Sequence, residues 1–276
     1  MKIFVLISTI DRRVLRVPEM VRVQETDVHY VVVWKTTREW DDIDLSDLTA
    51  RKDVTLVAQE GHGLSRSRNL AMETALGLLS EPTEDAVFVI ADDDETFRSD
   101  AFGLLNSYYL QHPDVDIALM RTRSNISRHY FKKYPAKECD YRKRPRSYYP
   151  ISVEMTIRSR VCHAGIRFDE RFGLGSYKLC AGEEDIFLTD ALDSGLRIVV
   201  TPIDLAYTRP QTSGSRHFDT KVLRSKGAVY GYTRSWTGAF LRSLREAVSL
   251  SVRHRRRFIP VFRKIWYGVK YIRNVS

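Results

Sequence analysis

A strongly apolar stretch that ends in three consecutive acidic residues constrains this chain more than any other feature of its sequence. Residues 86–91 are Ala-Val-Phe-Val-Ile-Ala, and Asp92, Asp93 and Asp94 follow directly. An unbroken apolar run of this length predicts a strand that is buried on both faces. Carboxylates so close together repel one another unless a cation shares the site. The pattern therefore indicates either a divalent-metal site at the end of a strand or a solvated acidic turn before the next helix.

Apolar runs alternate with helical patterns along the first half of the chain. Strands are predicted over residues 2–8, 28–34, 54–58, 86–91 and 115–120, and helices over residues 65–79 and 100–111. Alternation at this spacing is typical of an α/β fold in which helices flank a mostly parallel central sheet with right-handed crossovers.

The alternation is interrupted at residues 121–150, which are rich in Arg, Lys and Tyr and poor in apolar residues. We expect a long mobile loop here, and loops of this length often cover a binding site. A strand is predicted over 151–158, a helix over 182–192, and a strand over 196–201 that Pro202 should end. From residue 220 the pattern is helical to the C-terminus, with a break expected at Pro260.

Composition favours one large domain, or a domain with an appendage, because the chain has 276 residues of which 43% are hydrophobic. No apolar run is long enough to cross a membrane, and the N-terminus lacks the pattern of a signal peptide. Cys139, Cys162 and Cys180 match neither a disulfide framework nor a zinc site. A cytoplasmic protein, without or with peripheral contact to the cytoplasmic face of the membrane, is therefore expected.

The net charge of +9 belongs to the C-terminal segment. No acidic residue follows Glu246, and the remainder of the chain is nearly neutral once the basic residues of that segment are set aside. These basic residues are Arg253, Arg255, Arg256, Arg257, Arg263, Lys264, Lys270 and Arg273. Apolar residues recur among them at helical spacing, at Phe258, Phe262, Ile265, Val269 and Ile272. Such a helix either lies on anionic lipid or packs on the body with its basic face in solvent. Nucleic-acid binding is disfavoured, because no nucleic-acid-binding motif accompanies the charge.

Polar residues follow several of the predicted strands. Ser8 and Thr9 come after the first strand, Trp34 after the second, and the three aspartates after the fourth. In open α/β sheets ligands bind at the carboxyl ends of strands, so these residues are expected to share one cleft. Mg²⁺ or Mn²⁺ held by one or two carboxylates keeps positions free for substrate phosphates, which suits this pattern better than Ca²⁺ does.

Two further clusters stand at predicted helix starts. Gly61 and Gly63 precede Ser65, Arg68 and Asn69, an arrangement that suits either anion binding at a helix N-terminus or an ordinary helix start capped by Ser65.

The second of these clusters follows Gly182 and consists of Glu183, Glu184 and Asp185. Acidic residues in a first helical turn complement the helix dipole, and in a buried site one of them can serve as a general base.

Taken in order, these motifs resemble those of the family-2 glycosyltransferases with a GT-A fold, particularly bacterial members that build capsular or other surface polysaccharides. The motifs are Ser8-Thr9-x-Asp11-Arg12, Gly63-Leu64-Ser65-x-Ser67-Arg68-Asn69, Asp92-Asp93-Asp94 and Gly182-Glu183-Glu184. The resemblance covers about residues 1–235. Asp11 stands where the family usually has Asn, and Trp34 follows the second strand where an acidic residue often contacts the nucleobase.

The resemblance implies a role for each cluster. Asp92 and Asp94 would hold Mn²⁺ or Mg²⁺ on the donor diphosphate, with Asp94 as the preferred direct ligand and His217 as a further candidate. Glu184, or Asp185 as its close rival, would be the catalytic base. Contacts to the nucleotide-sugar are implied for Ser8, Thr9, Asp11, Trp34, Ser65, Arg68, Asn69, Asp92, Asp93 and Glu183. Trp34 is as well explained by the hydrophobic core, and His217 by a loop position without a metal.

The resemblance also implies an organisation and an activity. Residues 1–219 would form the GT-A domain, with a nucleotide-sugar half over about 1–122 and an acceptor half over about 150–219. Residues 220–276 lie mostly beyond the resemblance, and their helical pattern and basic charge predict a C-terminal extension for which membrane contact is favoured, because a lipid-linked acceptor would require the enzyme to work there. The implied enzyme is an inverting, metal-dependent transferase that moves a sugar from a nucleoside-diphosphate sugar, in the first place a UDP-sugar, to a saccharide or lipid-linked saccharide.

Two alternatives stay open. A sugar-phosphate nucleotidyltransferase would use the same sheet and aspartates but would release pyrophosphate. A non-enzymatic basic protein that binds lipid or nucleic acid would leave both acidic clusters unexplained.

Overall fold

The computed structural model describes residues 1–22, 26–37, 43–81, 83–130, 132–209 and 218–274. Apart from the residues left out, the chain forms two compact units, and each is described by itself. Unit 1 comprises Met1–Gly61, Arg66–Arg167 and Asp190–Pro210, and unit 2 comprises His62–Ser65, Phe168–Thr189 and Gln211–Ser276.

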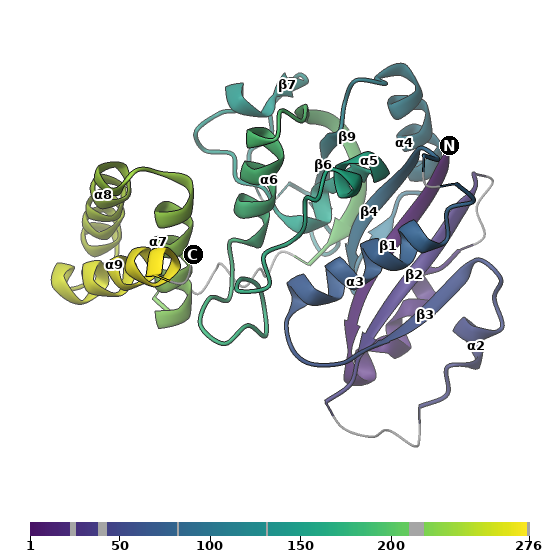
Figure 1. Ribbon diagram of the computed structural model, residues 1–276, viewed down its shortest axis with the longest axis horizontal. Helices are drawn as coiled ribbons and strands as arrows, with labels where there is room; N and C mark the ends of the chain where they lie inside the picture. Colours follow the sequence, from purple (N-terminus) through teal and green to yellow (C-terminus); the bar gives the residue numbers. More distant parts are fainter. Residues whose placement is uncertain (23–25, 38–42, 82, 131, 210–217, 275–276) are drawn as a thin grey trace. The chain divides into compact units, whose positions relative to one another are not determined.

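Unit 1 is built on a mixed, mostly parallel sheet (Figure 1). Its strands within the described residues are β1 (Lys2–Ile10), β2 (Val28–Lys35), β3 (Val54–Gln59), β4 (Ala86–Asp92), β5 (Thr96–Phe97), β6 (Ile117–Ser124), β7 (Cys139–Asp140), β8 (Met155–Arg158) and β9 (Ile198–Thr208). The order is β3-β2-β1-β4-β8-β6-β9-β5, with β7 paired to β9. Strands β1 to β4 are parallel to one another, as the unbroken apolar runs predict. Strand β8 is antiparallel to both β4 and β6.

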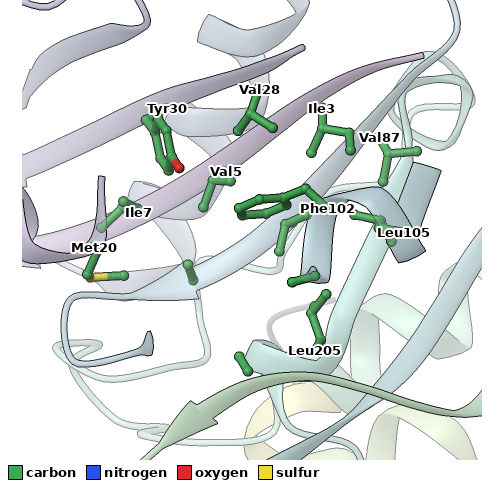
Figure 2. Packing of buried hydrophobic residues seen from close by; sticks show 14 of the residues in the cluster. Ile3, Val5, Ile7, Met20, Val28, Tyr30, Val87, Phe102, Leu105 and Leu205 are labelled. Carbon is green, nitrogen blue, oxygen red and sulfur yellow. The ribbon is translucent and has the colours of Figure 1, made fainter. Parts of the chain in front are cut away.

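Helices cover both faces of this sheet. The helical segments of unit 1 are η1 (Asp11–Arg16), α1 (Val17–Met20), α2 (Ser46–Thr49), α3 (Leu64–Gly77), α4 (Ala101–Gln111), η2 (Tyr141–Lys143), η3 (Ser152–Glu154) and α5 (Ser159–His163), with the first residues of α3 assigned to unit 2. Helix α6 (Glu183–Asp193) begins in unit 2, which contains it up to Thr189. Alternate strand residues such as Ile3, Val5 and Val87 pack with Phe102 and Leu105 of α4 on one face (Figure 2). Helices α3 and α5 lie on the opposite face (Figure 1). The predicted α/β fold is thus confirmed.

The predicted end of the last strand at Pro202 is wrong, because β9 continues to Thr208. Leu119 of β6 pairs with Val200 and Arg121 pairs with Asp204, so the pairing register shifts at Pro202. A β-bulge leaves residues out of the ladder, and a proline there removes no hydrogen bond from it. The proline is therefore accommodated within the strand.

The single loop predicted over 121–150 is also wrong in part, because β6 runs into it and β7 and η2 lie within it. Side chains of this segment surround Glu154, which is fully buried. Lys132 Nζ lies 2.7 Å from its carboxylate, Tyr148 Oη donates to it at 2.8 Å, and Tyr134 Oη donates as well. The strand predicted over 151–158 starts only at Met155, since η3 precedes it.

Unit 2 has a helical core. Its main helices are α7 (Thr220–Thr233), α8 (Trp236–His254) and α9 (Phe258–Asn274). Helix α8 ends where Arg255 adopts a left-handed conformation with φ of 51°. The break predicted at Pro260 is wrong, because Pro260 lies in the first turn of α9, where a proline interrupts no helical hydrogen bond.

Helices α7 and α9 approach each other very closely through glycines. A Cβ built on Gly227 would lie 1.8 Å from the carbonyl oxygen of Ile265, and one on Gly268 would lie 1.9 Å from that of Arg224. The apolar stripe of α9 fills this contact, and Ile265, Val269 and Ile272 are fully buried. The interpretation that places this stripe on lipid is therefore wrong, because the stripe forms the core of unit 2. No helix among the described residues is long and apolar enough to span a membrane.

Candidate functional site

The polar ends of three neighbouring strands in unit 1 meet at one edge of the sheet. Ser8 pairs with Val33 of β2 on one side and with Asp92 of β4 on the other, and Thr9 pairs with Trp34. Because all three strands are parallel, their carboxyl ends present these residues side by side. The predicted convergence of strand ends is confirmed.

Asp93 ties β1 to the turn that follows β4. Its carboxylate is buried and accepts a hydrogen bond of 2.7 Å from Thr9 Oγ1 and another from Arg13. Burial raises the pKa of Asp93, and the hydrogen bonds from Thr9 and Arg13 oppose that effect. Because Thr9 and Arg13 already bond to Asp93 inside the protein, Asp92 and Asp94 are the carboxylates of this run that are left to bind a ligand.

Arginines lie near Asp92 and Asp94, at distances too long for strong hydrogen bonds. Arg68 Nη2 lies 3.4 Å from Asp92, while Arg13 and Arg209 lie 3.8 and 3.7 Å from Asp94. The side chain of Asp92 is 34% exposed and that of Asp94 is 20% exposed, so solvent reaches both carboxylates. Loose ion pairs of this kind leave carboxylates able to bind a cation, and the guanidinium groups suit a diphosphate.

Arg68, for which a contact with the nucleotide-sugar was predicted, is almost completely buried. Its side chain is 1% exposed, and Nη2 donates to Ser152 Oγ at 2.6 Å and to Asp92 at 3.4 Å. The guanidinium thus connects η3 to the end of β4. Asn69, its neighbour on α3, is also buried. Ser152 escaped the sequence analysis, because a serine in a segment predicted as a strand carries no signal.

Glu95 is a second residue that the sequence analysis missed. It is 2% exposed, and its Oε1 accepts a hydrogen bond of 3.0 Å from the backbone N–H of Asp92, which holds the acidic turn. Oε2 has no hydrogen-bond partner in the described structure. Burial, reinforced by the charges of Asp92 and Asp94, raises the pKa of Glu95 well above its ordinary value. The signal was present, since Glu95 extends the acidic run by one residue.

Asp11 and Trp34 interact with each other beside the same edge. Asp11 adopts a left-handed conformation with φ of 48° directly after β1, and its carboxylate accepts hydrogen bonds from the backbone and side chain of Thr37. Trp34 donates its indole N–H to the carbonyl oxygen of Asp11 at 3.0 Å and packs partly against the core. Both alternatives for Trp34 remain compatible with this half-buried position.

The other predicted residues lie in unit 2. Ser65 is fully buried and donates to the carbonyl oxygen of Phe172 at 2.8 Å. A Cβ on Gly173 would lie 2.8 Å from Ser65 Oγ and 3.4 Å from the Glu183 carboxylate, so these three residues are packed together. Ser65 is inside α3 rather than before it, which makes the predicted helix cap wrong.

The two candidate bases stand in the first turn of α6, as predicted. Glu184 and Asp185 are half-buried, whereas Glu183 is 5% exposed. His217 lies outside the described residues. At the strand ends of unit 1 the structure brings together five of the residues predicted to contact the donor, namely Ser8, Thr9, Trp34, Asp92 and Asp93. Ser65 and Glu183, which were also predicted to contact the donor, lie instead in unit 2, as do Glu184 and Asp185.

The chemistry of Asp92 and Asp94 fits a Mg²⁺ or Mn²⁺ ion. Among the described residues no group of three or more His, Cys, Asp or Glu side chains is arranged to hold a metal. Mg²⁺ in phosphate-transfer sites needs only one or two carboxylates, because substrate phosphates and water complete its octahedron. Two partly exposed carboxylates beside arginines match that requirement.

The sheet order and the helices on both faces define an α/β protein with a mixed, mostly parallel sheet, which is the class that the sequence predicts. No protein-family model matches the chain, and no curated protein does. Among solved structures, the chain is similar to TarS 1–349 of S. aureus at a TM-score of 0.59 and 15% identity, over 92% of this chain and 73% of that one.

Complexes of the same TarS fragment match equally well. The structure with UDP has a TM-score of 0.57 at 14% identity, over 92% of this chain and 73% of that one. The structure with UDP-GlcNAc has a TM-score of 0.58 at 14% identity, over 99% and 84%. Another TarS structure is covered over 44% of its length. At these identities the likeness confirms the predicted fold.

Proposed function

We propose that this chain is an inverting glycosyltransferase of the family-2 type. It would transfer a sugar from a nucleoside-diphosphate sugar, with a UDP-sugar as first candidate, to a hydroxyl of a saccharide or lipid-linked saccharide during synthesis of a bacterial surface polysaccharide. One observation carries the proposal. Asp92 and Asp94 stand partly exposed among arginines at the carboxyl end of a parallel strand. The fold around them is shared with TarS, a protein solved with UDP-GlcNAc.

In this proposal the acidic turn and its arginines bind the donor. Asp92 and Asp94 would hold Mn²⁺ or Mg²⁺, which when bound offsets the charge that develops on the departing nucleoside diphosphate. Arg13 and Arg209, both near Asp94, supply guanidinium groups for the phosphate oxygens. Glu95 and Arg68 would hold the acidic turn in place, because each is buried and forms a hydrogen bond with Asp92.

The proton of the acceptor hydroxyl would pass to the acidic cluster of α6. Glu184 is the first candidate and Asp185 the second. As the hydroxyl oxygen attacks the anomeric carbon, the bond from that carbon to the diphosphate oxygen breaks, and the hydroxyl proton moves to the carboxylate. Attack from the face opposite the leaving group inverts the anomeric configuration.

Thermal-shift measurements with a panel of nucleoside diphosphates, with and without Mn²⁺, test donor binding. We expect metal-dependent stabilisation by one nucleotide, and its loss in the double variant Asp92→Asn/Asp94→Asn. Asp47→Asn is the matched control, because Asp47 is an exposed carboxylate on α2. Unchanged stabilisation in the double variant would refute the donor site.

Turnover assays separate the candidate bases and the alternative reaction. The variant that removes the true base, Glu184→Gln or Asp185→Asn, should lose turnover while it keeps the nucleotide-dependent thermal shift. Release of a nucleoside diphosphate supports sugar transfer. Release of pyrophosphate from a nucleoside triphosphate would instead identify a sugar-phosphate nucleotidyltransferase.

A further inference from the structure

Helix α8 has two apolar faces, and the rest of the described chain covers one of them. The covered face contributes Ala247 and Leu250 to the core of unit 2. The other face carries a row of aliphatic side chains that are exposed by 58%, 36%, 47% and 76%, namely Leu241, Leu244, Val248 and Val252. Residues at this spacing lie along one side of a helix, so they form a continuous apolar row. An apolar row of this length on the surface marks a site of interaction.

The row continues onto the neighbouring helix. Phe240, which precedes the row by one residue, is 42% exposed and contacts the rings of Phe262 and Trp266 edge-on at 5.9 and 5.6 Å between centroids. Ile259, near the start of α9, is 60% exposed. The apolar surface thus includes aromatic rings, which favour the boundary between water and hydrocarbon.

Cationic residues border this surface. Arg245 lies exposed beside the row, Arg253 is exposed in the last turn of α8, and the turn between α8 and α9 exposes Arg255, Arg256 and Arg257. The sequence from residue 220 to residue 276 contains one acidic residue, Glu246. Its carboxylate is 2.6 Å from Lys226 Nζ, so it is already neutralised within the unit. The field around the apolar row is therefore strongly positive.

We propose that unit 2 docks on an anionic lipid surface through this exposed face of α8. The helix would lie in the plane of the interface, with the aliphatic row in the hydrocarbon boundary and the arginines on lipid phosphates. The combination of apolar row and cationic border selects the partner. A nucleic acid offers phosphates for the arginines but no apolar region in which Leu241 and Val252 could be buried. A second copy of this chain would bring two positively charged faces together, which repel each other.

This surface differs from the one expected from the sequence. The stripe of α9 has the clearer amphipathic pattern, yet it is buried against α7, and the exposed row belongs to the helix before it. Lipid docking rests on the proposed function only for its purpose, which is to bring the enzyme to a lipid-linked acceptor. The binding itself needs neither donor nor metal and can be measured without them.

Sedimentation of the full chain with lipid vesicles tests the proposal. Wild type should sediment with vesicles that contain phosphatidylglycerol, bind weakly to pure phosphatidylcholine vesicles, and dissociate as salt is raised. The double variant Leu241→Ser/Val248→Ser should partition roughly tenfold more weakly or worse, because two exposed apolar side chains are lost from the contact. Arg245→Glu should weaken binding to anionic vesicles only.

Leu110→Ser is the matched control, since Leu110 is a 60% exposed leucine on α4 in unit 1, and it should bind as wild type does. If the double variant does not fold, Val252→Ser alone gives the same test at a 76% exposed position. Wild-type binding by a folded row variant would overturn the proposal. So would a wild-type dimer in solution that the row variant converts to a monomer, because the face would then join two copies.

The outcomes also separate this proposal from the proposed function. A row variant that loses vesicle binding but keeps nucleotide-dependent stabilisation and transfer to a soluble acceptor supports both. Vesicle binding without any nucleotide effect supports lipid docking and refutes the transferase. Nucleotide binding without vesicle binding refutes lipid docking alone.

Discussion

Replacing Gly268 by alanine should destabilise unit 2 because the added methyl group would meet the backbone of another helix. The new Cβ would lie 1.9 Å from the carbonyl oxygen of Arg224 and 2.8 Å from the amide nitrogen of Ala228. Real Cβ atoms stay beyond 3.0 Å of such atoms, so α7 and α9 must separate by at least about 1.1 Å at this point. A backbone carbonyl cannot rotate away as a side chain can, and the helices must move as units.

The size of the effect follows from two opposing contributions. Overpacking of a core costs about 1–3 kcal/mol, and the upper part of that range applies where backbone atoms clash. Alanine favours the helix over glycine by up to about 1 kcal/mol, which offsets part of the cost. We expect a net loss of about 2 kcal/mol in the free energy of unfolding, which lowers Tm by roughly 4–8 °C in a chain of this size.

Thermal denaturation followed by circular dichroism measures this loss, with Gly103→Ala as the matched control. Gly103 lies in α4, and no atom is within 4 Å of the position that its Cβ would occupy. There the same substitution should stabilise by about 0.5–1 kcal/mol, because only helix propensity and unfolded-state entropy change. The reasoning is refuted if Gly268→Ala and Gly103→Ala shift Tm in the same direction.

Two further predictions concern buried carboxyl groups. Burial raises the folded pKa of Glu95 well above the ordinary value for a glutamate, so the stability from this group is present in acid, below the pKa of the unfolded chain, and is lost as pH rises through the folded pKa. Glu95→Gln should therefore show a smaller fall in Tm than wild type as pH rises from acid through that range, and an identical pH dependence would contradict the burial argument. Lys132→Met should cost about 3–5 kcal/mol, because it leaves Glu154 buried without its cation, and adding Glu154→Gln should recover most of that loss in chemical denaturation.

The sequence predicted the parts of the fold that local patterns determine. Unbroken apolar runs located β1 to β4, and the residues after them identified the edge where the polar side chains meet. The sequence-based predictions were wrong where contacts between distant segments determine the structure. A proline such as Pro202 is expected to end a strand, but here the register shift between β6 and β9 accommodates it within the strand. The apolar stripe of α9 suits contact with lipid and burial in a core equally well in the sequence. It is buried in the core because the glycines of α7 let α7 and α9 approach each other closely.

The candidate site shows the same division. The run from Asp92 to Asp94 is visible in the sequence because like charges cluster there. The partners that divide the work among these carboxylates come from distant segments, since Thr9 and Arg13 hold Asp93, while Arg68 lies against Asp92. No local pattern records such pairings, and burial of Arg68 behind Ser152 is known only once the chain is folded.

The position of β8 has a consequence for how the protein is made. Strands β1 to β4 are complete once residue 92 has left the ribosome, and they pair only with one another up to that point. Strand β8 lies between β4 and β6, although it follows both in the chain. During synthesis the outer edge of β4 must therefore stay unpaired until residue 158 emerges, and an unpaired strand edge invites aggregation. We expect nascent chains to need protection during this interval, and the earliest folded intermediate to be the parallel layer β3-β2-β1-β4.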